Sequence, residues 1–217
     1  MKKIKIPVEK FGKFFREIAV IVIGVAITLS ASYWINNRNI EKDIALYLDA
    51  IKLELEENIR VLEEANNNFI QTSVNYSGYL MSQEKKLLNL DSLIFYRNIA
   101  YNNTPITIKT NAFDMFKAYG NMRLVTDKKL LLSLWDTYAK LAELKQGLEG
   151  IQGMKMDEIK KYIYLNSMPD EELLKAPPLY DFYVNLQVPR VQRDMIHYTI
   201  TFLNETISMI EKTKETK

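Results

Sequence analysis

The residues of this sequence that could carry out acid–base or metal chemistry are one histidine and several carboxylates. His197 is the single histidine, and Asp194 stands three positions before it, a spacing that places both side chains on one face of a helix. Di-metal helical bundles use two Glu-x-x-His motifs, whereas this chain offers one Asp-x-x-His. The paired carboxylates are Glu56–Glu57, Glu63–Glu64 and Glu171–Glu172. Without a second motif we expect no metal site, and we interpret His197 as a structural residue.

The patterns of other catalytic sites are also missing. The sequence holds no cysteine, which excludes disulfides, thiolate nucleophiles and zinc–thiolate sites. It holds no glycine-rich phosphate loop, no Gly-x-Ser-x-Gly elbow and no His-Glu-x-x-His motif. We therefore expect no enzymatic activity and no cofactor. An envelope enzyme stays open as an alternative, which carboxylates with strongly shifted pKa values around His197 would support.

The distribution of charge divides the sequence in two. The chain has 217 residues and a net charge of +2, but residues 1–38 carry seven Lys/Arg and two Glu, a charge of +5. The remainder is mildly acidic, at −3, and has no basic stripe of the kind that binds nucleic acid. Seven Gly and six Pro are few for this length, which favours helices over a fold with many turns.

The basic segment leads into an apolar stretch long enough to cross a membrane. Residues 18–35 include no charged side chain. Eighteen residues in a helix extend over about 27 Å, close to the ~30 Å thickness of a hydrocarbon core. Arg16 on one side and Tyr33 and Trp34 on the other are residue types that anchor a helix at the lipid–water interface. We predict a transmembrane helix over 18–35.

The charges on the two sides of this stretch orient it. Six Lys/Arg oppose two Glu in residues 1–17, whereas the charges that follow the stretch balance. This asymmetry predicts a cytoplasmic N-terminus and an extracytoplasmic body over residues 36–217. Two alternatives stay open. Residues 30–32, Ser-Ala-Ser, form a tolerable signal-peptide cleavage site, and an apolar stretch can also be the buried helix of a soluble domain.

Small residues recur every four positions within the stretch, at Gly24, Thr28 and Ser32. At this spacing two helices can approach closely, and their hydroxyl groups can hydrogen-bond across the interface. This face therefore predicts self-association in the membrane. The alternative is that these residues have no partner, because Gly, Ser and Thr are common in single membrane spans.

Beyond the span, residues 40–65 carry an apolar heptad pattern with one polar member. The positions of this seam are Ile44, Leu48, Ile51, Leu55, Asn58 and Leu62. Such a seam could join protomers as a coiled-coil-like stalk, in which a buried Asn58 would fix the register. Leu46, Leu53 and Val61 widen the apolar stripe, and this width favours a helix that packs inside a bundle.

The remaining sequence completes an all-α protein with an extracytoplasmic bundle of four or five main helices. We expect further helices over 69–90, 91–101, 112–119, 126–148 and 154–165, and a last helix that opens at Pro189. We predict an extended loop over residues 102–110 from their composition. We predict a linker before the last helix over residues 166–188.

Cap and turn residues mark the ends of these helices. Thr126 has the residue type of an N-cap, and Gly120 is suited to a left-handed C-cap. Three glycines at Gly147, Gly150 and Gly153 predict a turn that ends the preceding helix near residue 148.

The N-terminal residues also follow a longer pattern. It consists of Glu17, Ile18, Val22, Ile23, Gly24, Ile27, Leu29, Trp34 and Arg38. These positions resemble, without a gap, the signature of a bacterial family of small single-pass membrane proteins that has no assigned activity. The chain departs at Arg16, where the family favours Gly, and at Ser32-Tyr33, where it favours Asn-Asn. Residues 112–138 resemble the body of the same family loosely.

The resemblance implies an uncleaved anchor, a helical extracytoplasmic domain and no known chemistry. In a bacterium, the predicted orientation places the anchor in the inner (cytoplasmic) membrane and the body in the periplasm. We predict a membrane-anchored interaction or scaffold module that self-associates and whose partners are the lipid bilayer, further copies of the chain and other envelope proteins. The alternative is an extracytoplasmic ligand sensor. About 17 cytoplasmic residues are too few for an output domain, so a sensor would signal through a partner membrane protein.

Overall fold

The structure is a computed structural model, and it describes residues 8–83, 88–101, 106–161, 169–177 and 179–215. Within these ranges every regular element is a helix and no strand occurs, so the prediction of an all-α protein is confirmed. The chain divides into two compact units, Met1–Leu46 and Tyr47–Lys217. The predicted boundary after residue 35 separates the span from the extracytoplasmic body, so it marks the membrane surface and not a division in packing. It stays a prediction.

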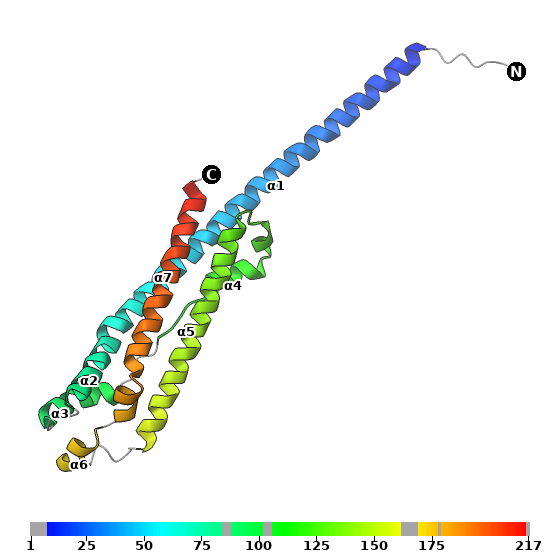
Figure 1. The fold of residues 1–217 in the computed structure, drawn as a ribbon. Coiled ribbons are helices and arrows are strands. Elements are labelled where there is room, and N and C mark those ends of the chain that lie inside the picture. Colours follow the sequence, from blue (N-terminus) through cyan, green and yellow to red (C-terminus); the bar gives the residue numbers. More distant parts are fainter. Residues whose placement is uncertain (1–7, 84–87, 102–105, 162–168, 178, 216–217) are drawn as a thin grey trace. The chain divides into compact units, whose positions relative to one another are not determined.

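The longest element, α1 (Val8–Ala65), contains both the predicted span and the predicted stalk (Figure 1). No proline occurs between Pro7 and Pro105, so nothing in this stretch removes a backbone donor from the helix. Within the first unit the large apolar side chains between Ile18 and Ile35 are exposed. Among the described residues, one helix is long and apolar enough to cross a membrane, and it is this one.

The heptad seam in the second half of α1 is buried. All six of its members are at most 6% exposed: Ile44, Leu48, Ile51, Leu55, Asn58 and Leu62. Leu62, for example, packs in one cluster with Ile70, Leu144 and Ile196 of the same chain. The seam residues of the second unit are therefore covered by side chains of the same chain.

Helix α1 continues almost without interruption into the next helix. A π-helical turn, η1 (Asn66–Ile70), joins it to α2 (Gln71–Ser82). The three consecutive asparagines at 66–68 therefore widen the helix for one turn instead of ending it.

Two shorter helices follow, α3 (Leu90–Tyr101) and α4 (Asn111–Ala118). Gly120 comes after α4 with φ of +70°, which confirms the predicted left-handed cap, a conformation that glycine adopts without strain. The 3₁₀ turn η2 (Asn121–Leu124) then leads to the next long helix.

That helix, α5 (Lys128–Lys161), is longer than predicted. It runs for 34 residues through all three glycines that were expected to end it. At Gly147 an added Cβ would lie 2.5 Å from the Cε atom of Met195 on the last helix, α7 (Val188–Glu215). The end of the flexible Met195 side chain thus occupies the space beside Gly147. The prediction of a turn is wrong, because the helix continues through all three glycines.

The N-cap of α5 is Asp127 and not Thr126. One carboxylate oxygen of Asp127 accepts hydrogen bonds from the backbone N–H groups of Lys129 and Leu130, each at 3.0 Å, which satisfies two of the donors left open at a helix start. The other oxygen accepts from the Thr213 hydroxyl at 3.4 Å. The start of α5 and the end of α7 thus lie at the same end of the second unit.

The segment predicted as a linker, 166–188, carries more structure than a linker requires. Where it is described, it contains α6 (Asp170–Lys175) and the π turn η4 (Asp181–Asn185). Phe182, Tyr183 and Val184 are buried in one apolar cluster together with Tyr76 of α2. These three side chains therefore form part of the core.

Buried hydroxyl groups connect α5 to α7, which lie side by side (Figure 1). The Oγ1 atom of Thr206 lies 2.7 Å from Oγ1 of Thr137 and 2.8 Å from Oγ of Ser133. Because buried polar groups require partners, these contacts fix the register of the two helices along each other.

Candidate functional site

The exposed small-residue face of α1 is the first candidate contact site. Gly24, Thr28 and Ser32 are all exposed, and a Cβ added at Gly24 would meet no atom within 4 Å. The Thr28 hydroxyl donates to the carbonyl oxygen of Gly24 at 2.9 Å, so its proton is used within the helix while its oxygen can still accept. The face allows a close approach by another helix, and its use as an interface stays a prediction.

The predicted interface anchors flank the apolar stretch on the same helix. Arg16, Tyr33 and Trp34 are exposed. The guanidinium of Arg38 lies 5.2 Å from the centre of the Trp34 ring, a distance suited to a cation–π contact. The contact holds a positive charge beside an amphipathic ring, which is the combination expected at headgroup depth.

His197 is the residue that the sequence singled out for acid–base or metal chemistry. The side chain is exposed on α7. The carboxylate of Asp194, the neighbour that the sequence suggested, accepts hydrogen bonds from the guanidinium of Arg193 at 3.0 and 3.1 Å. In the part of the chain that the structure describes, no three His, Asp or Glu side chains gather in a way that could hold a metal ion.

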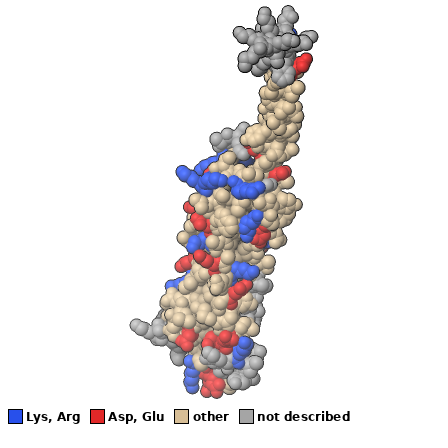
Figure 2. Space-filling view, turned by 90° about the vertical axis from the view of Figure 1, so that its right-hand side faces the viewer, with Lys and Arg blue, Asp and Glu red and all other residues tan. Residues whose placement is uncertain are grey.

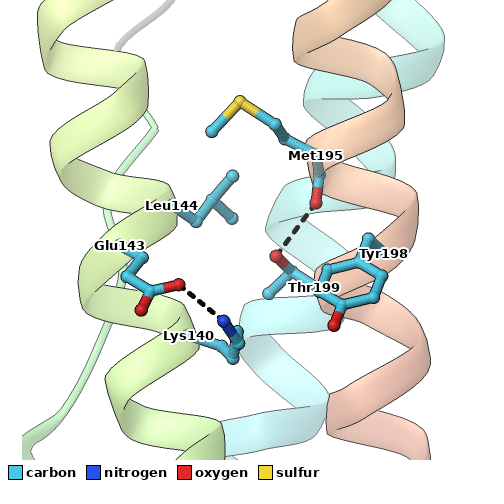
Figure 3. Close-up of a pocket in the computed structure, with 6 residues that line it drawn as sticks. All are labelled: Lys140, Glu143, Leu144, Met195, Tyr198 and Thr199. Carbon is cyan, nitrogen blue, oxygen red and sulfur yellow. Dashed lines mark hydrogen bonds and ion pairs between the residues drawn. The ribbon is translucent and has the colours of Figure 1, made fainter.

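A small cavity lies between α5 and α7 (Figure 3). Its volume is about 130 Å³, and its lining consists of Lys140, Glu143, Leu144, Met195, Tyr198 and Thr199. Lys140 forms an ion pair with Glu143 at 2.7 Å, and the Thr199 hydroxyl donates to a backbone carbonyl at 2.9 Å. Its polar groups therefore engage one another, and the cavity is smaller than the ~300–1,000 Å³ of typical small-molecule sites.

A buried polar clamp, formed by Glu54 and Asn58 of α1, holds the segment before α4. The Asn58 side chain donates to the carbonyl of Lys109 and accepts from its N–H, each at 2.9 Å. One turn earlier, Glu54 accepts from the N–H of Ala112 at 2.8 Å and from the hydroxyl of Tyr138 at 2.6 Å. The clamp thus holds Lys109 and the first turn of α4 against α1.

The electrostatics of the clamp indicate a structural role. Ala112 lies in the first turn of α4, where the helix dipole favours a negative charge such as that of Glu54. Burial, with the adjacent carboxylate as a second cause, raises the pKa of the Tyr138 hydroxyl above its usual value, so this group stays protonated and continues to donate. Both Glu54 and Asn58 are satisfied by the chain's own groups.

Sequence reasoning found one member of the clamp and missed the other. Asn58 was recognised as a buried polar member of the seam, but its partner is the Lys109 backbone rather than a second copy. Glu54 was not recognised, although a glutamate next to the seam position Leu55 could have indicated a buried carboxylate.

Comparisons with known proteins assign no family to the chain: no family model matches the sequence, and neither a curated protein nor a solved structure matches it. The resemblance at residues 17–38 therefore stays a prediction, and the candidate functions depend on the chain's own surfaces.

Proposed function

We propose that the chain is a non-enzymatic, single-pass membrane module that holds a helical domain at the periplasmic face of a bacterial inner membrane. There it acts as an interaction or scaffold protein through contacts with further copies of itself and with other envelope proteins. The proposal includes an outer bundle of four or five main helices and membership in the uncharacterised family that residues 17–38 resemble.

The observation that supports the anchor is the exposed apolar surface of α1. Between Ile18 and Ile35 its aliphatic side chains are exposed on every side of the helix. Soluble monomers rarely expose continuous apolar surface of this extent. In hydrocarbon the same surface is favourable, and the helix satisfies its own backbone groups there.

The charge asymmetry supports the orientation. Six Lys/Arg precede the span and oppose two Glu, which favours retention of this side in the cytoplasm. The second unit, which begins at Tyr47, is then periplasmic.

Scaffolding is favoured over ligand sensing by the cavity between α5 and α7. Its volume of about 130 Å³ leaves no room for a metabolite-sized ligand. A sensor of a metabolite-sized ligand would need a larger site than this cavity.

Single cysteines in this cysteine-free chain test the anchor and its orientation. We expect a membrane-impermeant maleimide to label Glu149→Cys in spheroplasts and Lys5→Cys only after lysis, with the unmodified chain as the unlabelled control. The reverse pattern would contradict the orientation. Release of the protein by alkaline carbonate would contradict the anchor, and a mature N-terminus near residue 31 would identify the span as a cleaved signal peptide.

Crosslinking in membranes tests self-association. Gly24→Leu together with Thr28→Leu places two large side chains on the small-residue face, and we expect it to reduce the crosslinked dimer several-fold. The matched control, Ile23→Leu with Ile27→Leu, changes positions outside this face and keeps their size. Equal dimer yields from both variants would remove the span from the proposed interface.

A further inference from the structure

The segment between α4 and α5 combines exposed apolar and basic side chains. This α4–α5 tip, residues 119–129, exposes Tyr119 and Leu124 to 66% and 39%. Its cations are Arg123, Lys128 and Lys129, all exposed. Apolar side chains flanked by long basic ones are typical of segments that lie at a lipid–water interface, because the aliphatic stems can be buried while the charges reach the headgroups.

The tip lies at the end of the second unit where the chain enters it. The ring of Tyr47, the first residue of this unit, lies 5.5 Å from the ring of Tyr119. The contact between Thr213 and Asp127 brings the end of α7, with Lys212 and Lys214, to the same place. Figure 2 shows Lys and Arg side chains gathered across this end of the unit.

Three carboxylates near this end are engaged by other groups, and the tip itself carries three cations and one carboxylate. The carboxylate of Asp127 caps α5, that of Asp114 pairs with Lys117 at 2.6 Å, and that of Asp49 pairs with Lys214. Among the described residues, Arg123 and Lys129 have no carboxylate partner. Arg123 and Lys129, which lie close to the exposed Leu124 in the sequence, can therefore pair with an anionic partner outside the chain.

The length of chain between span and tip brings a membrane within range. Tyr47 lies twelve positions after Ile35, the last residue of the predicted span, which corresponds to about 18 Å of helix. The headgroup layer and the reach of an arginine side chain cover part of this distance, and a tilt of the span in the bilayer covers the rest.

We propose that the α4–α5 tip docks on the anionic phosphate headgroups of the bilayer that holds the span. Arg123 and Lys129 pair with lipid phosphates, and Leu124 and Tyr119 enter the interfacial layer between them. Docking restricts the tilt of the outer domain against the membrane. The inference depends on the proposed membrane anchor, and charge complementarity selects the lipid surface over a second copy, whose tip would carry the same positive charge.

A spin label at Thr126→Cys in the full-length chain tests the docking. Thr126 is exposed within the tip and has no part in the proposed contacts. In nanodiscs that contain phosphatidylglycerol we expect the label to be less mobile and closer to the headgroups than in pure phosphatidylcholine, and 0.5 M salt should reverse the difference. Basic residues near an anionic surface each contribute a factor of about five, so Arg123→Gln with Lys129→Gln should lower the docked-to-free ratio on the order of 20-fold.

The matched control is Lys160→Gln with Lys175→Gln. It changes the charge equally at the opposite end of the second unit, where α6 and the end of α5 lie (Figure 1), and it should leave the Thr126 label unchanged. Equal label mobility in both lipids would overturn the inference. Spin–spin broadening that is independent of lipid composition would overturn it in favour of a second copy at the tip. Failure of the chain to enter nanodiscs would contradict the proposed anchor instead.

Discussion

The two halves of α1 use apolar residues in opposite ways. In the first unit Ile21 and Leu29 are 65% and 66% exposed, whereas in the second unit Ile51 and Leu55 are fully buried. Between Ile18 and Ile35 the first half exposes apolar side chains around its whole circumference. In the second half the apolar seam occupies one face, and Lys52 and Glu56 of the neighbouring faces form an ion pair at 3.6 Å. The second pattern is that of a helix with protein on one side and water on the other, and the first is the pattern that the proposed membrane anchor requires.

The largest expected effect is the loss of the anchor in Ile21→Arg with Val25→Arg. An arginine near the centre of a span costs roughly 3 kcal/mol on insertion scales, so the pair costs about 6 kcal/mol. We expect the variant to leave the membrane fraction after carbonate washing. The control is Leu46→Arg with Leu53→Arg, two exposed positions of the same helix outside the span, which should stay membrane-bound. Retention of the first variant would contradict the assignment of the first half to lipid.

The second prediction compares Leu55→Ala with Leu53→Ala, two positions apart on α1. Leu55 is fully buried and Leu53 is 66% exposed. Removal of a buried leucine side chain costs about 2–5 kcal/mol, whereas an exposed one changes stability by about 0.5 kcal/mol or less. Urea unfolding of the full-length protein in detergent measures both. Similar losses at the two sites would show that the second half of α1 has no distinct buried face.

The third prediction concerns a cation buried in the second unit. Lys155 is 4% exposed, its ammonium lies 5.2 Å from the Phe69 ring, and burial lowers its pKa to about 8. Between pH 8 and 10.5 the unfolded chain therefore binds more protons than the folded one, and stability rises with pH by up to about 3 kcal/mol.

Lys155→Met should be more stable than the natural chain at pH 7, by about 1–3 kcal/mol. Its stability should no longer rise between pH 8 and 10.5, because the titrating group is gone. The exposed Lys160→Met is the control and should keep the rise. Unfolding in urea at pH 7 and pH 9.5 measures the difference. Parallel pH profiles for Lys155→Met and the natural chain would contradict a burial cost at this position.

The fourth prediction concerns the polar clamp, whose loss has a local effect. Asn58→Ala leaves the N–H and carbonyl of Lys109 without their partner, which costs about 1–3 kcal/mol. Hydrogen exchange should accelerate at residues 109–113 and remain unchanged in the span. Asn75→Ala, an exposed asparagine on α2, serves as the control. Unchanged exchange at 109–113 would show that another contact holds this segment.

Local signals were sufficient for several elements of the fold. The all-α class follows from sparse Gly and Pro and from helical periodicity, and the cap at Gly120 follows from the preference of a left-handed position for glycine. The predicted N-cap of α5, Thr126, was one residue away from the observed one, Asp127. Both residue types can cap a helix, and the choice depends on where the first turn of α5 begins. The candidate small-residue face follows from spacing alone, and the structure places its three members on exposed helix without giving them a partner among the described residues.

Other predictions were wrong where contacts with a distant segment determine the structural role of a residue. Gly147 has the residue type of a turn, but Met195 on α7 uses the space that its missing side chain leaves. Residues 166–188 have the composition of a linker, but Phe182 and Tyr183 are core residues because α2 and α7 leave an apolar surface for them to cover.

The long apolar helix near the N-terminus can be predicted from local residues, because transfer of side chains to an apolar medium is a local property and a helix satisfies its own backbone groups. The roles of the heptad seam, Asn58 and Glu54 become clear from the folded chain. Their partners lie far along the chain, 51 residues from Asn58 to Lys109 and 84 from Glu54 to Tyr138. A buried polar group requires a partner, but its sequence neighbours do not specify which distant group folding brings to it.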